Sequence, residues 1–309
     1  LFSRTLTKPI GRLVAGAKRI GSGDFTSRVP TKPNDEIGQL ADSFNKMATG
    51  LEERDKIKSA FGKFVNKDLA DKVMKGEIAL GGESRNVCIF FSDIRSFTAI
   101  SERLSPHEVV DFLNEYMSLM VDCVNRTHGI VDKFIGDAIM ATWGVPSSRG
   151  NDTENAINCA LLMRKVLIEY NRNRGGPRKP IIKIGCGINT GEVITGQIGS
   201  TERMEYTCIG DAVNLASRIE ALNKLFHTDI LISQRSYEQV KNIYVVEPMK
   251  MIRVKGKESA LQIYAVLGRR ADPSCIRSLG QLRALLGLGP VDLDTINPDR
   301  EEQKYELVT

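Results

Sequence analysis

Two acidic residues follow apolar segments, and their side chains could share one chemical task. Asp93 comes after the apolar run 87–91, which is typical of a strand buried on both faces. Asp137 belongs to a Gly-Asp pair between the apolar runs 130–135 and 138–143, a pattern that favours a two-residue hairpin. Carboxylates at a strand end and a hairpin tip can form an oxygen-rich site. Such a site suits Mg²⁺ or Mn²⁺.

Either aspartate alone would be ordinary turn chemistry, because Asp is common at strand ends and in turns. The residues around the pair make it more informative. The first segment reads F-S-D-I-R-S-F-T (91–98), and the second reads D-K-F-I-G-D-A-I-M-A (132–141). Two more motifs follow in the chain, Y-T-C-I-G-D-A-V-N-L-A-S-R (206–218) and V-K-G-K (254–257).

These four motifs, in this order, resemble the catalytic domain of class III nucleotidyl cyclases, the adenylate and guanylate cyclases. The resemblance covers about residues 84–268. The strand and helix patterns alternate in this stretch, with a strand expected over 180–189 and a glycine-punctuated turn and strand over 191–199. Both observations predict an α+β domain with a ferredoxin-like βαββαβ core. The resemblance implies cyclisation of a nucleoside triphosphate, in which the ribose 3′-hydroxyl attacks the α-phosphorus and pyrophosphate leaves.

By this resemblance, Asp93 and Asp137 hold two divalent ions per site, Mg²⁺ or Mn²⁺. The backbone carbonyl of Ile94 adds an oxygen to one of them. Two ions suit an in-line displacement, because one activates the attacking hydroxyl and the other neutralises the leaving phosphates.

The resemblance also assigns substrate contacts. Backbone N–H groups across 95–98, where the chain turns into a helix, would receive phosphate oxygens, which places Phe97 and Thr98 in the substrate site. Lys133 and Thr207 correspond to the pair that reads the base. A Lys donor and a Thr acceptor match adenine N1 and its 6-amino group, whereas guanylate cyclases place Glu and Cys at these positions. Many adenylate cyclases have Asp where this chain has Thr207, so Thr is a departure within the family's range that weakens the ATP assignment without reversing it. ATP is the expected substrate, and GTP is the alternative.

Three more residues complete the set. Asn214 and Arg218 lie four apart, on one face of the predicted helix 211–225. By resemblance, Asn214 positions the ribose, Arg218 stabilises charge on the α-phosphoryl group, and Lys255 meets the triphosphate. In this family the metal aspartates and the base-reading and transition-state residues come from opposite chains. One chain with the whole set therefore implies a homodimer with two equivalent sites.

The N-terminal part has the pattern of two amphipathic helices, over 6–21 and 37–51, the second with a coiled-coil rhythm. The connector 22–33 is rich in Gly, Pro, Ser and Thr. This plan resembles a HAMP domain, whose pattern Pro9 and the run Asp-Glu-Ile-Gly (35–38) match. It predicts a parallel dimeric four-helix bundle, and a plain dimerisation coiled coil is the alternative.

The expected domain organisation has four parts: a HAMP domain (1–55), a coiled-coil or transducer linker (56–83), the cyclase domain (84–268) and a weakly ordered tail (269–309) with one helical patch. HAMP domains usually follow a membrane helix and relay motion from a sensor. The resemblance therefore implies a membrane-anchored parent with an upstream sensor and a cytoplasmic catalytic part. Because the chain opens with Leu1 and has no run of about 18 apolar residues, we expect a soluble fragment of that parent.

Composition narrows the function classes. The net charge of +5 is dispersed, and no basic block with interleaved aromatic residues is present, which argues against nucleic-acid binding. The six cysteines form no C-x-x-C pair, and most lie in apolar surroundings typical of reduced core thiols. An adenylate cyclase is the favoured function. A guanylate cyclase is the near alternative, and a catalytically inactive dimeric signalling module is disfavoured because the residue set is complete.

Overall fold

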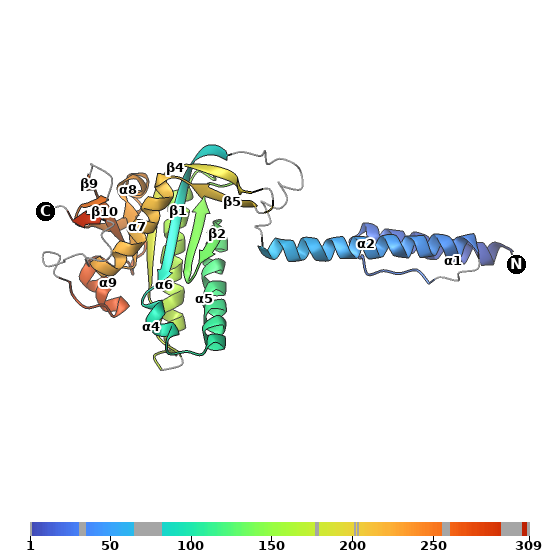
Figure 1. Ribbon diagram of the computed structural model, residues 1–309, viewed down its shortest axis with the longest axis horizontal. Helices are drawn as coiled ribbons and strands as arrows, with labels where there is room; N and C mark the ends of the chain where they lie inside the picture. Colours follow the sequence, from blue (N-terminus) through green and yellow to red (C-terminus); the bar gives the residue numbers. More distant parts are fainter. Residues whose placement is uncertain are drawn as a thin grey trace. The chain divides into compact units, whose positions relative to one another are not determined.

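The computed structural model describes residues 2–30, 35–64, 82–176, 179–200, 202, 204–254, 260–291 and 305–307 (Figure 1). The chain divides into two compact units, Leu1–Glu77 and Ile78–Thr309. Each unit is considered separately below. Among the helices of the described residues, none is both long and apolar enough to cross a membrane.

The N-terminal unit is a pair of helices, α1 (Phe2–Gly21) and α2 (Glu36–Phe64). Gly16 allows close packing, because a Cβ atom there would lie 2.8 Å from the Val29 side chain. Asn45 on α2 holds the connector, since its side chain accepts from the Val29 N–H and donates to the Val29 carbonyl, both at 2.8 Å. The predicted helix–connector–helix plan is confirmed.

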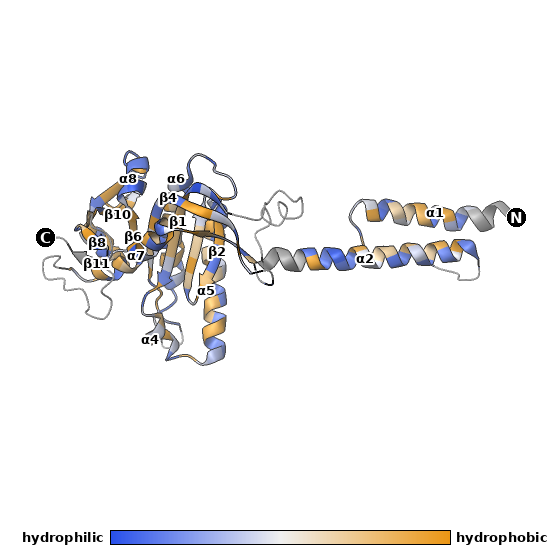
Figure 2. Ribbon diagram, turned by 45° about the horizontal axis from the view of Figure 1, so that its top comes forward, coloured by the Kyte–Doolittle hydropathy of each residue, from blue (hydrophilic) through white to orange (hydrophobic). Residues whose placement is uncertain are grey.

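The second helix is longer than its apolar seam, whose residues lie three or four positions apart from Ile37 to Leu51. The next apolar residue of the pattern is Ile57, a gap that fits neither spacing, yet α2 continues without a break to Phe64. A change in seam phase alters which face is apolar, whereas the backbone hydrogen bonds of a helix do not depend on that face. Hydrophobic and hydrophilic residues alternate along both helices (Figure 2). The helix expected over 68–75 lies outside the described residues.

The second unit is built on a sheet with the strand order β2–β3–β1–β4–β6–β10–β7, in which β5 pairs with β4. Its strands are β1 (Gly82–Ile94), β2 (Ile130–Ile135), β3 (Ala138–Trp143), β4 (Ile184–Gly199), β5 (Met204–Ile209), β6 (Ile230–Ser233), β7 (Tyr244–Pro248) and β10 (Ile263–Arg269). A smaller sheet contains β8 (Ile252–Val254), β9 (Ala260–Leu261) and β11 (Tyr305–Leu307).

The helices of this unit are α4 (Phe97–Ser101), α5 (Pro106–Arg126), α6 (Asp152–Asn171), α7 (Asp211–Phe226), α8 (Gln234–Val240) and α9 (Leu279–Leu286). The order β1, α5, β2, β3, α6, β4 with the antiparallel arrangement β2–β3–β1–β4 confirms the ferredoxin-like core. Helix α5 begins at a capping box formed by Ser105 and Glu108, with Pro106 at the first helical position.

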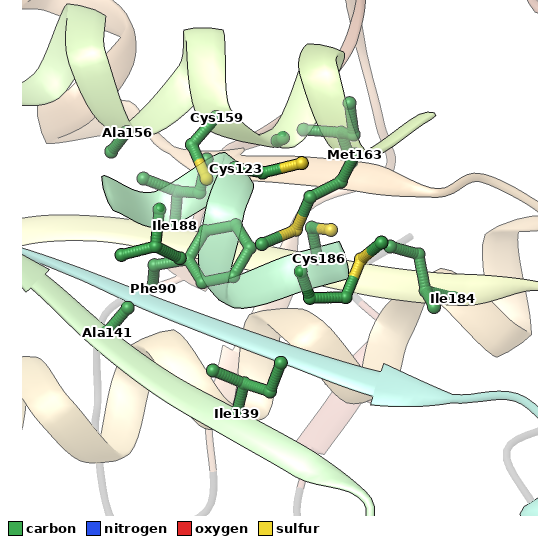
Figure 3. Packing of buried hydrophobic residues seen from close by; sticks show 14 of the residues in the cluster. Phe90, Cys123, Ile139, Ala141, Ala156, Cys159, Met163, Ile184, Cys186 and Ile188 are labelled. Atoms are coloured by element: carbon green, nitrogen blue, oxygen red, sulfur yellow. The ribbon is translucent and has the colours of Figure 1, made fainter. Parts of the chain in front are cut away.

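Strand β1 is buried on both faces, which confirms the interpretation of its apolar run. Cys88 and Phe90 face α5 and α6, where Figure 3 shows Phe90 among sulfur-containing side chains. Val87 and Ile89 face the opposite side, where they pack with Ala216 of α7. The sheet is thus covered by helices on both sides, because successive side chains of a strand point to opposite faces.

Strand β4 differs from the expectation. The sequence predicts a strand over 180–189 and a glycine turn before a second strand, whereas β4 is one strand of 16 residues. The glycines serve helix packing instead of a turn. A Cβ atom on Gly187 would lie 2.2 Å from the Glu220 N atom, and one on Gly191 would lie 2.6 Å from the Ala212 side chain. Helix α7 can therefore lie directly on β4.

The one helical patch expected in the C-terminal tail is present as α9. This helix begins at the cap residue Ser278 and buries Leu282 completely. Arg283 donates to the carbonyl of Phe226 at the end of α7 at 3.0 Å. This short helix thus packs against the rest of the second unit, which local sequence pattern alone does not reveal.

Candidate active site

The two acidic motifs meet at one end of the sheet. Asp93 lies near the end of β1, and Asp137 lies in the turn between β2 and β3, where Gly136 adopts a φ of +65°. The backbone N–H of Ile94 lies 3.3 Å from Asp137 Oδ2 and 3.1 Å from Asp93 Oδ1. The antiparallel pairing of β1 with β3 carries the hairpin tip to the end of β1. The structure therefore brings Asp93, Ile94 and Asp137 together.

The electrostatics of this pair favour a cation. Burial raises the pKa of Asp93 to about 7, and the neighbouring carboxylate of Asp137 contributes to the rise through a hydrogen bond and charge repulsion. A divalent ion between the carboxylates would relieve that repulsion. In the described part of the chain, no group of three or more His, Cys, Asp or Glu side chains is placed to hold a metal. The two carboxylates and the Ile94 carbonyl fit Mg²⁺ or Mn²⁺, which commonly complete their shells with water and substrate phosphate.

The segment after the metal pair differs in one detail from the expectation. Phe97 and Thr98 form the first turn of α4, and the Phe97 ring stacks on Phe112 of α5 with 6.5 Å between centroids. The N–H of Arg95 donates to the Lys183 carbonyl at 2.8 Å, so it is not available to a phosphate. The predicted phosphate contact is therefore wrong for the Arg95 N–H. The contacts of Phe97 and Thr98 stay predictions.

The two residues predicted to read the base are held side by side by a third. The Thr207 hydroxyl on β5 donates to Asp132 on β2, with 2.9 Å to each carboxylate oxygen. Lys133 Nζ lies 2.9 Å from Glu205 Oε2 and 3.5 Å from Asp132 Oδ1. Burial raises the pKa of Asp132, while the Thr207 hydrogen bond and the Lys133 charge oppose the rise. Asp132, with only 4% of its side chain exposed, is a site residue that sequence reasoning missed.

A β-bulge explains why Asp132 and Lys133 act together. Neighbouring residues of a regular strand point to opposite faces. Here the register moves from the pair Val131–Ala141 directly to Lys133–Met140, which leaves Asp132 as the extra residue. Bulges re-aim side chains and are common beside active sites. Both side chains therefore reach β5, and a period-two pattern gives no signal of this.

The predicted transition-state residues lie on α7. Ala216 and Ile219 are buried against the rest of the domain, whereas Asn214 is exposed and Arg218 is partly exposed. Among the described residues, no hydrogen bond or ion pair joins Asn214 or Arg218 to the metal aspartates or to the base-reading pair. Lys255 lies outside the described residues.

Comparison with known proteins decides the family. Residues 82–268 match the adenylate and guanylate cyclase catalytic domain, and residues 1–53 match the HAMP domain. The chain belongs to the adenylate and guanylate cyclase family. The predicted resemblance to class III cyclases with an N-terminal HAMP domain is thereby confirmed.

Relatives of both nucleotide specificities resemble this cyclase. The adenylate cyclase of Anabaena cylindrica is 38% identical over 284 residues, which is 86% of this chain and 55% of that protein. The guanylyl cyclase Cya2 is 34% identical with a TM-score of 0.58, over 64% of this chain and 100% of that one. The adenylyl cyclase CyaB from P. aeruginosa is 38% identical with a TM-score of 0.56, over 62% of this chain and 99% of that one. The cyclase chain spans about half the length of the curated relatives that it matches.

Proposed function

We propose that this cyclase converts ATP to 3′,5′-cyclic AMP and pyrophosphate. The observation that supports ATP is the pair formed by Lys133 and Thr207, whose side chains lie together across β2 and β5. An ammonium donates to adenine N1, and a hydroxyl oxygen can accept from the adenine 6-amino group. Guanine presents a donor at N1 and an acceptor at O6, which reverses this pattern. Fold similarity does not choose between the bases, because similar structures include cyclases of both names.

The same site contains groups for the chemical step. Asp93 and Asp137, with the Ile94 carbonyl, would hold two divalent ions, which supply activation of the 3′-hydroxyl and neutralisation of the leaving phosphates. The Arg218 guanidinium would stabilise negative charge that develops on the α-phosphoryl group. The remaining substrate contacts are proposed for Phe97, Thr98, Asn214 and Lys255.

We propose that each site is shared between two copies of the chain. Within the described residues, no hydrogen bond or ion pair joins Asp93 to Arg218, which is compatible with the arrangement that the family resemblance implies, in which these two residues of one site come from opposite chains. Strands β2, β4 and β5 also expose large apolar side chains that a partner could cover. These are Phe134, Ile135, Ile194, Met204 and Ile209, each more than 40% exposed.

We further propose that the HAMP unit pairs in a parallel bundle and regulates the cyclase domain. Its two helices leave large apolar side chains exposed, at Ile10, Val14, Leu40 and Met47. A second copy would bury these side chains. In the parent protein this unit would lie between an upstream membrane sensor and a cytoplasmic cyclase domain. Replacement of residues 1–53 by an unrelated coiled coil of the same phase should abolish the response to that sensor, and an unchanged response would contradict this role.

A cyclase assay on the purified full chain tests the activity. ATP and GTP are each supplied with Mg²⁺ and with Mn²⁺, and the cyclic products are separated by chromatography. We expect cyclic AMP, with kcat/KM for ATP exceeding that for GTP by at least about tenfold. Asp93→Asn is the control, and it should form neither product. A preference for GTP would make the protein a guanylate cyclase, and absence of both turnover and cation-dependent nucleotide binding would make it an inactive module.

A further inference from the structure

The hydroxyl of Thr207 could serve either purine. A hydroxyl donates one hydrogen bond and accepts others, and its hydrogen rotates to suit the partner. As an acceptor, Thr207 would pair with the 6-amino group of adenine. As a donor, it would pair with O6 of guanine. Thr207 alone therefore does not discriminate between the two bases, and selection requires another group that determines where the hydroxyl hydrogen points.

Asp132 is placed to determine it. The Thr207 oxygen lies 2.9 Å from each carboxylate oxygen of Asp132, which is a donor position relative to both. The other described partners of this carboxylate are also donors: the Cys208 N–H at 3.3 Å and the Lys133 ammonium at 3.5 Å. A carboxylate whose partners all donate is held as the anion, and an anion only accepts. The Thr207 hydrogen consequently points at Asp132, and the lone pairs of the hydroxyl face the base site.

We propose that Asp132 is a specificity-determining positioning residue that makes Thr207 an acceptor only and thereby selects adenine over guanine. This inference rests on the proposed function of the site. Guanine O6 opposite an acceptor-only hydroxyl would leave two acceptors facing each other without a hydrogen between them. Such an unpaired, desolvated polar group is costly. Asp132 acts through Thr207 rather than by touching the nucleotide.

The geometry around Asp132 agrees with a functional role. The β-bulge turns Asp132 toward β5 beside Lys133, so both members of the base-reading pair contact one carboxylate. A buried carboxylate is expensive unless it is paired, and here it is satisfied by three donors. The competing explanation is that Asp132 only ties β2 to β5. That explanation predicts that substitution of Asp132 lowers kcat/KM for ATP and for GTP by the same factor.

The test compares nucleotide preference rather than activity alone. In Asp132→Asn, the amide can donate to the Thr207 oxygen, which frees the Thr207 hydrogen for guanine O6. We expect the ratio of kcat/KM for ATP to that for GTP to fall at least about tenfold. The fall should disappear in a Thr207→Val background, where no hydroxyl remains to be oriented. Thr207→Ser keeps the hydroxyl and should keep the ratio.

Glu205→Gln is the matched control. Like Asp132→Asn, it removes a carboxylate that contacts Lys133, here at 2.9 Å. Unlike Asp132, Glu205 does not accept the hydrogen bond of Thr207. It should change kcat/KM for ATP and for GTP by the same factor and leave their ratio unchanged. The ratio of the dissociation constants of 3′-deoxy-ATP and 3′-deoxy-GTP, which lack the attacking hydroxyl, measures the base preference without turnover. Asp132→Ser provides a second neutral variant if Asp132→Asn does not fold.

The outcomes separate this inference from the proposed function. If the wild-type chain prefers ATP and Asp132→Asn lowers kcat/KM for both nucleotides by the same factor, Asp132 only connects the strands and the inference is wrong. The inference would also be wrong if Glu205→Gln lowered the ratio of kcat/KM for ATP to that for GTP as much as Asp132→Asn does. If the wild-type chain prefers GTP or binds neither nucleotide, the proposed function has failed, and the inference fails with it.

Discussion

Mixing two inactive variants tests whether sites are shared between chains. Asp93→Ala removes a carboxylate of the metal pair, and Arg218→Ala removes the guanidinium proposed for the α-phosphoryl group. Loss of one such electrostatic group costs on the order of 10²-fold or more in rate, so each variant alone should be nearly inactive. If one chain supplies Asp93 and its partner supplies Arg218, a heterodimer of the two variants has one site that lacks both residues. Its other site is intact.

The size of the rescue follows from the symmetry of the dimer. After equal mixing and complete exchange, about half of the dimers contain one chain of each kind, and one of their two sites is intact. The mixture should therefore reach about one quarter of the wild-type rate of cyclic AMP formation. Co-expression with two different affinity tags isolates the heterodimer, which should reach about half of the wild-type rate per dimer. The rate is measured by chromatography at saturating ATP and Mn²⁺.

The matched control combines Asp93→Ala with Asp137→Ala. These residues lie together on one chain, so in a heterodimer each of the two sites lacks one carboxylate and no rescue is expected. Rescue by this control would refute the assignment of the aspartates to one chain. A doubly tagged heterodimer of Asp93→Ala and Arg218→Ala that shows no activity would refute the shared site itself.

Three further predictions concern stability. Mn²⁺ at 100 times its Kd should raise the free energy of unfolding of the wild-type protein in urea by about 2.7 kcal/mol, and by much less in Asp137→Asn; equal increases would place the ion elsewhere. Arg164→Ala should lower the free energy of unfolding in urea by about 3–5 kcal/mol, because it leaves the buried Asp229 carboxylate without its bidentate partner at 2.6 and 2.8 Å, and adding Asp229→Ala should restore part of the loss. Gly187→Ala should cost about 1–3 kcal/mol, because its Cβ would lie 2.2 Å from the backbone of α7, whereas Gly50→Ala, with nothing within 4 Å, should be neutral or stabilising.

The elements that position Asp93 and Asp137 were predictable because their sequence signals are local. The apolar run before Asp93 has the length and composition of a doubly buried strand, and β1 is buried on both faces. The Gly-Asp pair requires a left-handed backbone, and Gly136 adopts it. Ser105 and Pro106 start α5 through capping chemistry that acts within one turn.

Features that depend on distant contacts were not predictable. A glycine in a strand pattern usually indicates a bend or a bulge. Gly187 and Gly191 instead make room for α7, which follows later in the chain, and β4 passes through them without interruption. The packing of α9 on the end of α7 has the same origin, since Arg283 bonds the carbonyl of Phe226. In both cases the partner of the local pattern is set by the tertiary fold.

The position of Asp132 depends both on its local strand and on contacts with residues distant in the sequence. Strict alternation along β2 would place it on the face opposite to Lys133, and an acidic residue there would look like ordinary surface charge. The bulge cancels the alternation at that one residue, and its carboxylate then meets a hydroxyl that lies 75 residues away in the sequence. Sequence motifs identified the two groups proposed to face the base, Lys133 and Thr207. The direction in which Thr207 can hydrogen-bond depends on a third group, and only the folded register of β2 and β5 brings that group to it.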